Sequence, residues 1–157
     1  MIFNIFFAAL LTLSVVLSIL IARADFRRRI IPDAYLFPLM LLGLILTTFF
    51  GWPISVSSAV IGAAFGYTLA AATGFAFDYY LRRRGGADIP SPIGMGDIKL
   101  IGVGGIWLGT DGLAIALLIA CISGCLWARI RGQRFIPFAP FFLFGAFFGL
   151  LSLPLWL

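Results

Sequence analysis

A carboxylate beside two glycines, at Asp97, is the part of this sequence best suited to acid–base chemistry. It follows Gly94-Met95-Gly96 and precedes Ile98-Lys99-Leu100 at the start of a strongly apolar segment. An ionisable group at membrane depth is costly, so it indicates a functional site. The glycines leave room for another backbone to approach and allow φ values that other residues resist. An ordinary helix start, with Asp near the N-cap and Lys toward water, would explain the same residues.

Acid–base work falls to aspartate by elimination. The sequence has no histidine, and its acids are the six aspartates Asp25, Asp33, Asp78, Asp88, Asp97 and Asp111. The lack of histidine excludes Ser-His and Cys-His nucleophilic chemistry and histidine metal sites. Cys121 and Cys125 lie four residues apart in an apolar run, where we expect packing inside a bundle, and they make a poor zinc site. We therefore expect neither a metal nor another cofactor.

Asp97 needs a partner carboxylate. Two aspartates that share a proton can split a peptide bond through an activated water, one acting as base and the other as acid. The candidates on the side of the basic residues are Asp25, Asp33, Asp78 and Asp88. Asp25 could equally be a surface carboxylate paired with a neighbouring arginine, and Asp33, which follows Pro32, is expected to be a helix N-cap. Spacing alone does not choose among them.

Composition places these residues in a membrane protein. The chain has 157 residues, of which 62% are hydrophobic and 11% charged, whereas a soluble domain carries about 25% charged residues. We therefore expect an all-α, polytopic membrane helix bundle, formed by residues 1–157 as one domain.

Six apolar segments are expected to span the membrane. They are roughly Ile2–Ala22, Ala34–Phe50, Ser55–Tyr80, Asp97–Leu108, Gly112–Ile130 and Pro137–Leu157. The first is expected to be a retained span, since its charges follow it and do not precede it as in a signal peptide. The fourth would rise only ~20 Å against a ~30 Å hydrocarbon core. We expect its Gly94–Asp97 end to lie below the membrane surface.

Small residues predict close packing of the third and fourth segments. Gly62, Gly66, Ala70 and Gly74 recur every fourth residue in one, and Gly105 and Gly109 do so in the other. This spacing lets helix backbones approach one another in lipid.

The basic residues predict the orientation. With six spans, all eleven lysines and arginines fall at the ends that face the first, third and fifth connections. By the positive-inside rule these connections are cytoplasmic and both termini lie outside, as in a multi-pass protein of the cell inner membrane. The expected partners of the arginines are membrane lipids. Nucleic acid is not expected, because short loops between spans offer no fold to bind it.

Several motifs together resemble the type IV prepilin peptidase family. The first is Asp25 with Arg27–Arg29 and Ile31-Pro32-Asp33. The second is Gly94-Met95-Gly96-Asp97, and the third is Ile136-Pro137-Phe138-Ala139-Pro140-Phe141. The Gly-x-Gly-Asp motif alone is weak, because presenilin-like proteases share it, but the combination covers nearly the whole chain from Ala22 onward.

The resemblance implies an aspartic endopeptidase with Asp25 and Asp97 as the catalytic pair and Gly94 and Gly96 admitting the substrate backbone. It implies cleavage after a Gly, at the cytoplasmic face, of the leader of prepilins, pseudopilins or preflagellin-like proteins. Long family members carry a four-cysteine zinc cluster that is associated with N-methylation. Because this chain lacks the cluster, it resembles the short, peptidase-only members, and methyl transfer is not expected.

Two other functions fit some of the same residues. A presenilin-like intramembrane aspartic protease should carry its pair deep in two apolar helices, whereas Asp25 lies among arginines at a segment end. A small membrane transporter could also bury aspartates in a glycine-rich bundle, but it more often shows inverted repeats, and the sequence has no evident internal repeat.

Overall fold

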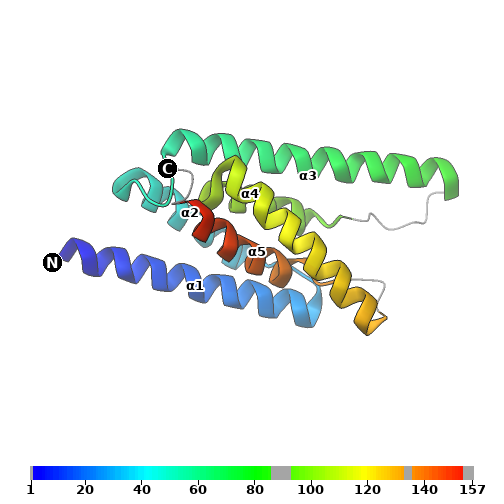
Figure 1. Ribbon diagram of the computed structural model, residues 1–157, viewed down its shortest axis with the longest axis horizontal. Helices are drawn as coiled ribbons and strands as arrows, with labels where there is room; N and C mark the ends of the chain where they lie inside the picture. Colours follow the sequence, from blue (N-terminus) through cyan, green and yellow to red (C-terminus); the bar gives the residue numbers. More distant parts are fainter. Residues whose placement is uncertain (1, 86–92, 133–135, 154–157) are drawn as a thin grey trace.

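A computed structural model describes residues 2–85, 93–132 and 136–153. Over these ranges the chain forms α-helices and no strand: α1 (Ile2–Arg28), α2 (Asp33–Phe50), α3 (Val56–Gly85), α4 (Met95–Arg131) and α5 (Phe138–Ser152). In the described ranges four helices, α1 to α4, are long and apolar enough to cross a membrane, and α5 is a shorter apolar helix. The expected all-α membrane bundle is confirmed at this level (Figure 1).

The number of helices differs from the prediction of six. The predicted fourth and fifth segments correspond to the two parts of α4, which are two helical stretches that meet at Gly109 without a connecting loop. Only Gly109 departs from helical geometry, with φ 65° and ψ −168°, a conformation that glycine adopts easily. The predicted turn at residues 109–112 therefore exists as a kink within α4, and the described ranges contain five helices.

The kink is sharp enough to fold α4 back on itself. A Cβ placed on Gly104 would lie 3.6 Å from Cδ1 of Leu113, although nine residues of straight helix span ~13.5 Å. Figure 1 shows the green first part of α4 and its yellow second part running in different directions. The first part packs along α3 and the second along α5.

Glycines bring these helices into backbone contact. A Cβ on Gly62 of α3 would collide with the carbonyl oxygen of Gly105 in α4, and a Cβ on Gly105 would collide with the backbone of Gly62. The predicted close packing of the third and fourth segments is thus confirmed. A second contact of this kind, between Gly145 of α5 and Ala116 of α4, was not predicted.

The start of α2 also differs from the prediction. Pro32, not Asp33, is the N-cap, with the extended backbone (φ −71°, ψ 126°) typical of that position. Asp33 is the first helical residue and makes no capping hydrogen bond. Its carboxylate instead binds Lys99 of α4, with Nζ 2.7 Å from Oδ2.

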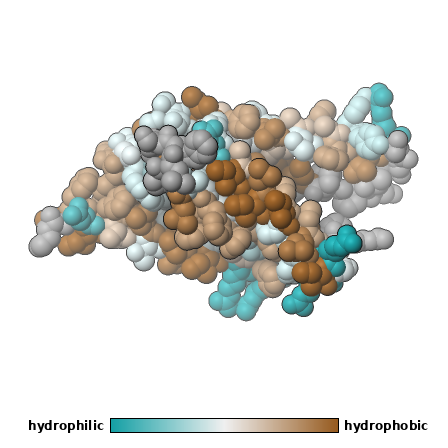
Figure 2. All heavy atoms as spheres, viewed as in Figure 1, coloured by the Kyte–Doolittle hydropathy of each residue, from teal (hydrophilic) through white to brown (hydrophobic). Residues whose placement is uncertain are grey.

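The surface of the bundle is apolar along its length. Large hydrophobic side chains are exposed on every helix, and Figure 2 shows brown and tan atoms over most of the visible face. Cys121 and Cys125 are part of this exposed surface. The prediction that they pack inside the bundle is wrong, because the buried side of α4 here is formed by Ala120 and Gly124. Such a surface suits a lipid environment.

The ends of several helices gather at two opposite sides of the bundle. In Figure 1, α1 begins and α5 ends at the left, whereas α1 and α4 end at the right. The arginines in the last turns of α1 and α4, Arg27, Arg28, Arg129 and Arg131, therefore lie at one end. This arrangement agrees with the predicted one-sided distribution of positive charge.

Candidate active site

Asp25 is a buried carboxylate near the end of α1. Its side chain is 4% exposed, and its Oδ2 accepts a hydrogen bond of 2.7 Å from the backbone N–H of Ala139. Ala139 lies in the first turn of α5, where backbone N–H groups have no helical partner. Pro140 has no N–H to offer. Asp25 therefore caps α5, and the interpretation of Asp25 as a surface carboxylate is wrong.

Asp97 lies in the first turn of α4. Its Oδ2 accepts a hydrogen bond of 3.3 Å from the backbone N–H of Gly94, the N-cap residue of the helix. A carboxylate at this position is favoured by the helix dipole, so part of the ordinary helix-start interpretation holds. Asp97 is half-buried, and its carboxylate interacts electrostatically with that of Asp25. The structure thus brings these two predicted catalytic residues together.

Gly94 and Gly96 are both tightly surrounded. A Cβ on Gly94 would lie 3.3 Å from Oδ2 of Asp97, and one on Gly96 would lie 3.0 Å from Cβ of Ile31. Gly96 therefore lets the start of α4 approach the segment that joins α1 to α2. Packing within the protein is therefore one reason for a glycine at this position. The predicted reason, access for a substrate backbone, is a second and separate one.

The other candidate partners lie elsewhere or have other contacts. Asp33 binds Lys99, and Asp78 of α3 forms an ion pair of 2.9 Å with Arg82 one turn later. Asp88 lies outside the described residues. Among the described aspartates, Asp25 is the one whose charge acts on Asp97.

Sequence reasoning missed three residues that shape this site. Ala139 binds Asp25, Ile31 packs against Gly96, and Lys99 links α4 to Asp33. The proline-rich element at residues 136–141 was the available signal for the first. Its two prolines mark a helix start, and the dipole at a helix N-terminus favours a nearby carboxylate.

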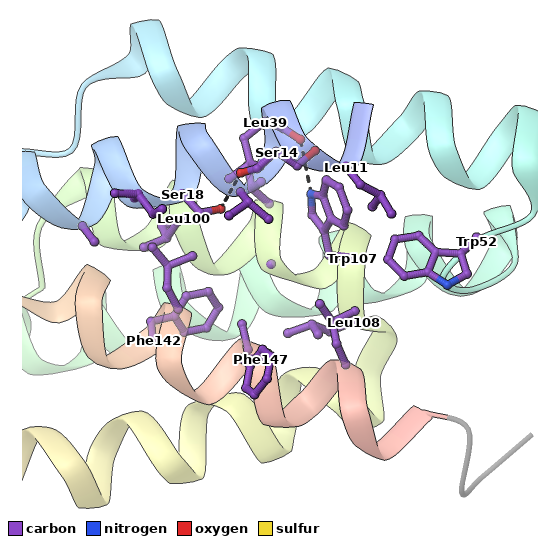
Figure 3. A pocket seen from close by; sticks show the side chains of 18 residues that line it. Leu11, Ser14, Ser18, Leu39, Trp52, Leu100, Trp107, Leu108, Phe142 and Phe147 are labelled. Carbon is purple, nitrogen blue, oxygen red and sulfur yellow. Dashed lines mark hydrogen bonds between the residues drawn. The ribbon is translucent and has the colours of Figure 1, made fainter. Parts of the chain in front are cut away.

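An apolar cavity of about 510 Å³ adjoins the site. At one end it is lined by Ala22 of α1 and Leu100 of α4, each three residues from one of the two carboxylates. At the other end lie Trp52 and Trp107, and Trp107 donates its indole N–H to the carbonyl of Leu39 at 3.2 Å. Figure 3 shows these tryptophans with Phe142 and Phe147 of α5 around the cavity. Sequence reasoning had not located this cavity.

Within the described residues, no group of three acidic, thiol or imidazole side chains gathers to hold a metal. What the site offers is a pair of interacting carboxylates, each held through Oδ2 by one backbone N–H. Such a pair can exchange protons with a water between an ionised and a protonated carboxyl group.

Comparison with curated proteins finds relatives along most of the chain. Three are named prepilin leader peptidase/N-methyltransferase. The protein from Escherichia coli (strain K12) is 30% identical over 93% of this chain and 60% of its own length. The protein from Burkholderia pseudomallei (strain 1026b) is 32% identical over 90% of this chain and 44% of its own length. The protein from Dichelobacter nodosus is 34% identical over 80% of this chain and 45% of its own length.

The chain thus spans between 44% and 60% of the length of these relatives. No solved structure matches it significantly. A family model described as the type IV leader peptidase family matches residues 3–129, which form most of the sequence. By this match, the chain belongs to the type IV leader peptidase family.

Proposed function

We propose that this protein is a membrane aspartic endopeptidase that removes the leader peptide of prepilins or pseudopilins. The observation that carries the proposal is the pairing of Asp25 and Asp97, whose carboxylates interact across the ends of α1 and α4. Family membership supports a leader peptidase, and it favours this function over a presenilin-like protease or a small transporter.

In the proposed reaction a water lies between the two carboxyl groups. One carboxylate takes a proton from this water, which attacks the scissile carbonyl, while the other carboxyl group donates its proton to the leaving amide nitrogen. The hydrogen bonds from Ala139 to Asp25 and from Gly94 to Asp97 orient both groups before substrate arrives. Preorganised polar groups of this kind lower the barrier without reorganisation during the reaction.

The substrate is proposed to approach with an extended segment that ends in Gly, followed by an apolar helix. The extended segment would meet the carboxylates beside Gly94 and Gly96. The helix would lie toward the apolar cavity, because Ala22 and Leu100 connect the cavity to the carboxylates along α1 and α4. Preflagellin-like proteins share this substrate chemistry.

The proposed location is the cell inner membrane, with the end that carries Asp25 and Asp97 at the cytoplasmic face. The arginines at the ends of α1 and α4 support this orientation. For residues 1–157 we propose peptidase activity without methyl transfer, because the two cysteines among them cannot form a four-cysteine cluster.

A cleavage assay tests the proposal. The purified full chain in detergent is incubated with prepilins from the same genome, with and without S-adenosylmethionine, and the products are sequenced from the N-terminus and weighed. We expect one new N-terminus directly after a Gly and no added methyl group. Cleavage within the apolar helix would favour the presenilin-like function, and intact prepilins would contradict the proposal.

A further inference from the structure

A second pocket lies at the same end of the bundle, and one of its lining residues, Phe26, directly follows Asp25 in the sequence. It has a volume of about 330 Å³ and is lined by Phe26, Arg29, Trp127, Arg131 and Pro137. These residues come from the ends of α1 and α4 and the start of α5, which lie close together at the right of Figure 1. The proposed peptide cleavage uses none of them.

Two arginines line this pocket, one directly after α1 and the other at the end of α4. A cation at a helix C-terminus is stabilised by the helix dipole, which explains why Arg29 and Arg131 stand where α1 and α4 end. The helix dipole does not explain why the two arginines line the same pocket, since like charges repel. Arg29 interacts electrostatically with Asp25, and Arg131 forms no ion pair within the described residues. An anion between the two guanidinium groups would relieve their repulsion.

The guanidinium group also suggests the kind of anion. Its planar fork of N–H donors matches the oxygens of a phosphate or carboxylate, and two such forks can bind one phosphate from two sides. The pocket has room for such a group, because its volume of about 330 Å³ is roughly ten times the ~30 Å³ that one water molecule takes up in the liquid.

Apolar side chains around the pocket indicate that the anion carries hydrocarbon. Phe26 and Trp127 make an edge-to-face contact between α1 and α4, with ring centroids 6.2 Å apart. Beside the arginines, Ile30 is 61% exposed and Ile130 is 74% exposed. Leu126, one turn before Ile130, is also exposed. Tryptophan is enriched at membrane interfaces, so an amphiphile fits this surface better than a free ion.

We propose that this pocket binds the phosphate of one anionic phospholipid, whose acyl chains lie on the exposed face formed by Leu126 and Ile130. The phosphate would join Arg29, the residue directly after α1, to Arg131 of α4. Because α1 packs mainly against α2 and α5, this bridge would add a link between the ends of α1 and α4. It would stabilise the end of α1 that carries Asp25.

Lipid binding can be measured without any substrate. The purified full chain is placed in nanodiscs of phosphatidylcholine with or without phosphatidylglycerol, and bound lipid is counted by native mass spectrometry after release into detergent. We expect wild type to retain one phosphatidylglycerol that Arg131→Gln and Arg29→Gln lose, with apparent affinity at least about tenfold lower. Arg129→Gln and Arg28→Gln are matched controls, because each removes the same charge from the same helix end outside the pocket.

Thermal unfolding gives a second reading. Phosphatidylglycerol should raise the Tm of wild type by about 5 °C over phosphatidylcholine alone, as expected of a ligand that binds only the folded state. The wild-type comparison does not depend on how any variant folds. In Arg131→Gln the gain should disappear, and in Arg129→Gln it should remain.

Two results would overturn the inference. One is equal retention of phosphatidylglycerol by the pocket variants and their controls. The other is an equal gain in Tm from inorganic phosphate added to phosphatidylcholine nanodiscs, which would indicate a site for a free anion. Since no prepilin is present, neither result bears on the proposed peptidase activity, and a failed cleavage assay leaves this inference untouched.

Discussion

Nζ of Lys99 lies 2.7 Å from Oδ2 and 3.0 Å from Oδ1 of Asp33, so one ion pair joins the start of α4 to the start of α2. Lys99 also lies over the ring of Phe37, 5.8 Å from its centroid. The link stands two residues from Asp97, on a different side of α4, since two residues turn a helix by about 200°. The ion pair therefore fixes the first turn of α4, and it does so from the side of the helix opposite the Asp97 carboxylate.

We expect Lys99→Met and Asp33→Asn to slow cleavage modestly. Both side chains are partly exposed, and such pairs contribute about 0.2–1 kcal/mol, so the loss in kcat should stay below about tenfold. The swap of Asp33→Lys with Lys99→Asp should recover part of it, because it restores an opposite pair. Steady-state kinetics on a prepilin measure this, with KM expected to change little. A swap as slow as either single variant would show that the pair does not position Asp97.

The limits of sequence-based prediction show clearly in α4. The apolar pattern and the turn residues at 109–112 indicated a break after Leu108, and a kink stands there. The pattern could not reveal that helical bonding resumes within one residue, because that depends on Gly109 adopting a positive φ against α3. Nor could it reveal the Asp33–Lys99 pair, whose partners lie 66 residues apart in the chain.

The prediction that Asp25 pairs with Asp97 came from the family resemblance, because the spacing of the aspartates alone left four possible partners for Asp97. The bond from Ala139 to Asp25 gives a physical reason to single out Asp25. Local patterns predict which residues start a helix, but they do not show which distant carboxylate caps it. That information appears only when α1 and α5 are packed together.

The contact between Gly62 and Gly105 should be intolerant of any side chain. We expect Gly62→Ala to lower the free energy of unfolding by about 1–3 kcal/mol, because its Cβ would collide with the backbone of α4. Gly74→Ala is the matched control on the same helix, since its Cβ would lie 3.6 Å from Ile93, an ordinary contact distance. Thermal unfolding in detergent compares the two. Helix propensity alone would stabilise both variants, since alanine is the better helix former, so equal changes of Tm would mean that the close approach at Gly62 does not decide its effect.

Gly96→Val should abolish cleavage while the protein still inserts into the membrane. A side chain there would displace Ile31, 3.0 Å from the added Cβ, and shift the start of α4 that carries Asp97. The second change Ile31→Ala should restore measurable activity if this contact is the cause. Normal turnover by Gly96→Val alone would remove the glycine from the site. Failure of the double variant to recover would favour obstruction of the substrate.

Reporter fusions should distinguish the two ends of the bundle. Fusions after Arg29, Gly85 and Gly132 are expected to report the cytoplasm, and fusions at Gly51 and Thr110 the periplasm, because the arginines gather at one end. The site at Thr110 is the most informative, since it follows the kink in α4. A cytoplasmic signal there would mean that the first part of α4 does not cross the membrane.

Asp25→Asn and Asp97→Asn should each lower kcat for prepilin cleavage by about 10²–10⁴-fold without unfolding the protein. Asparagine keeps an oxygen that can accept the N–H of Ala139 or Gly94, but it cannot exchange a proton. The double variant should be little slower than either single one, because residues that act as a unit lose their effect together. Single-turnover kinetics in detergent, with Tm as the check on folding, measure this.

The matched control is Asp78→Asn, which removes the same charge from an ion pair on α3 and should leave cleavage unchanged. Metal chelators should not inhibit, since the proposed water is activated by carboxylates alone. Full activity of Asp25→Asn combined with an inactive Asp33→Asn or Asp88→Asn would reassign the partner of Asp97 and keep the aspartic mechanism. If every aspartate variant cleaves prepilin at the wild-type rate, the paired carboxylates do not carry out the reaction, and the bond from Ala139 to Asp25 serves only to cap α5.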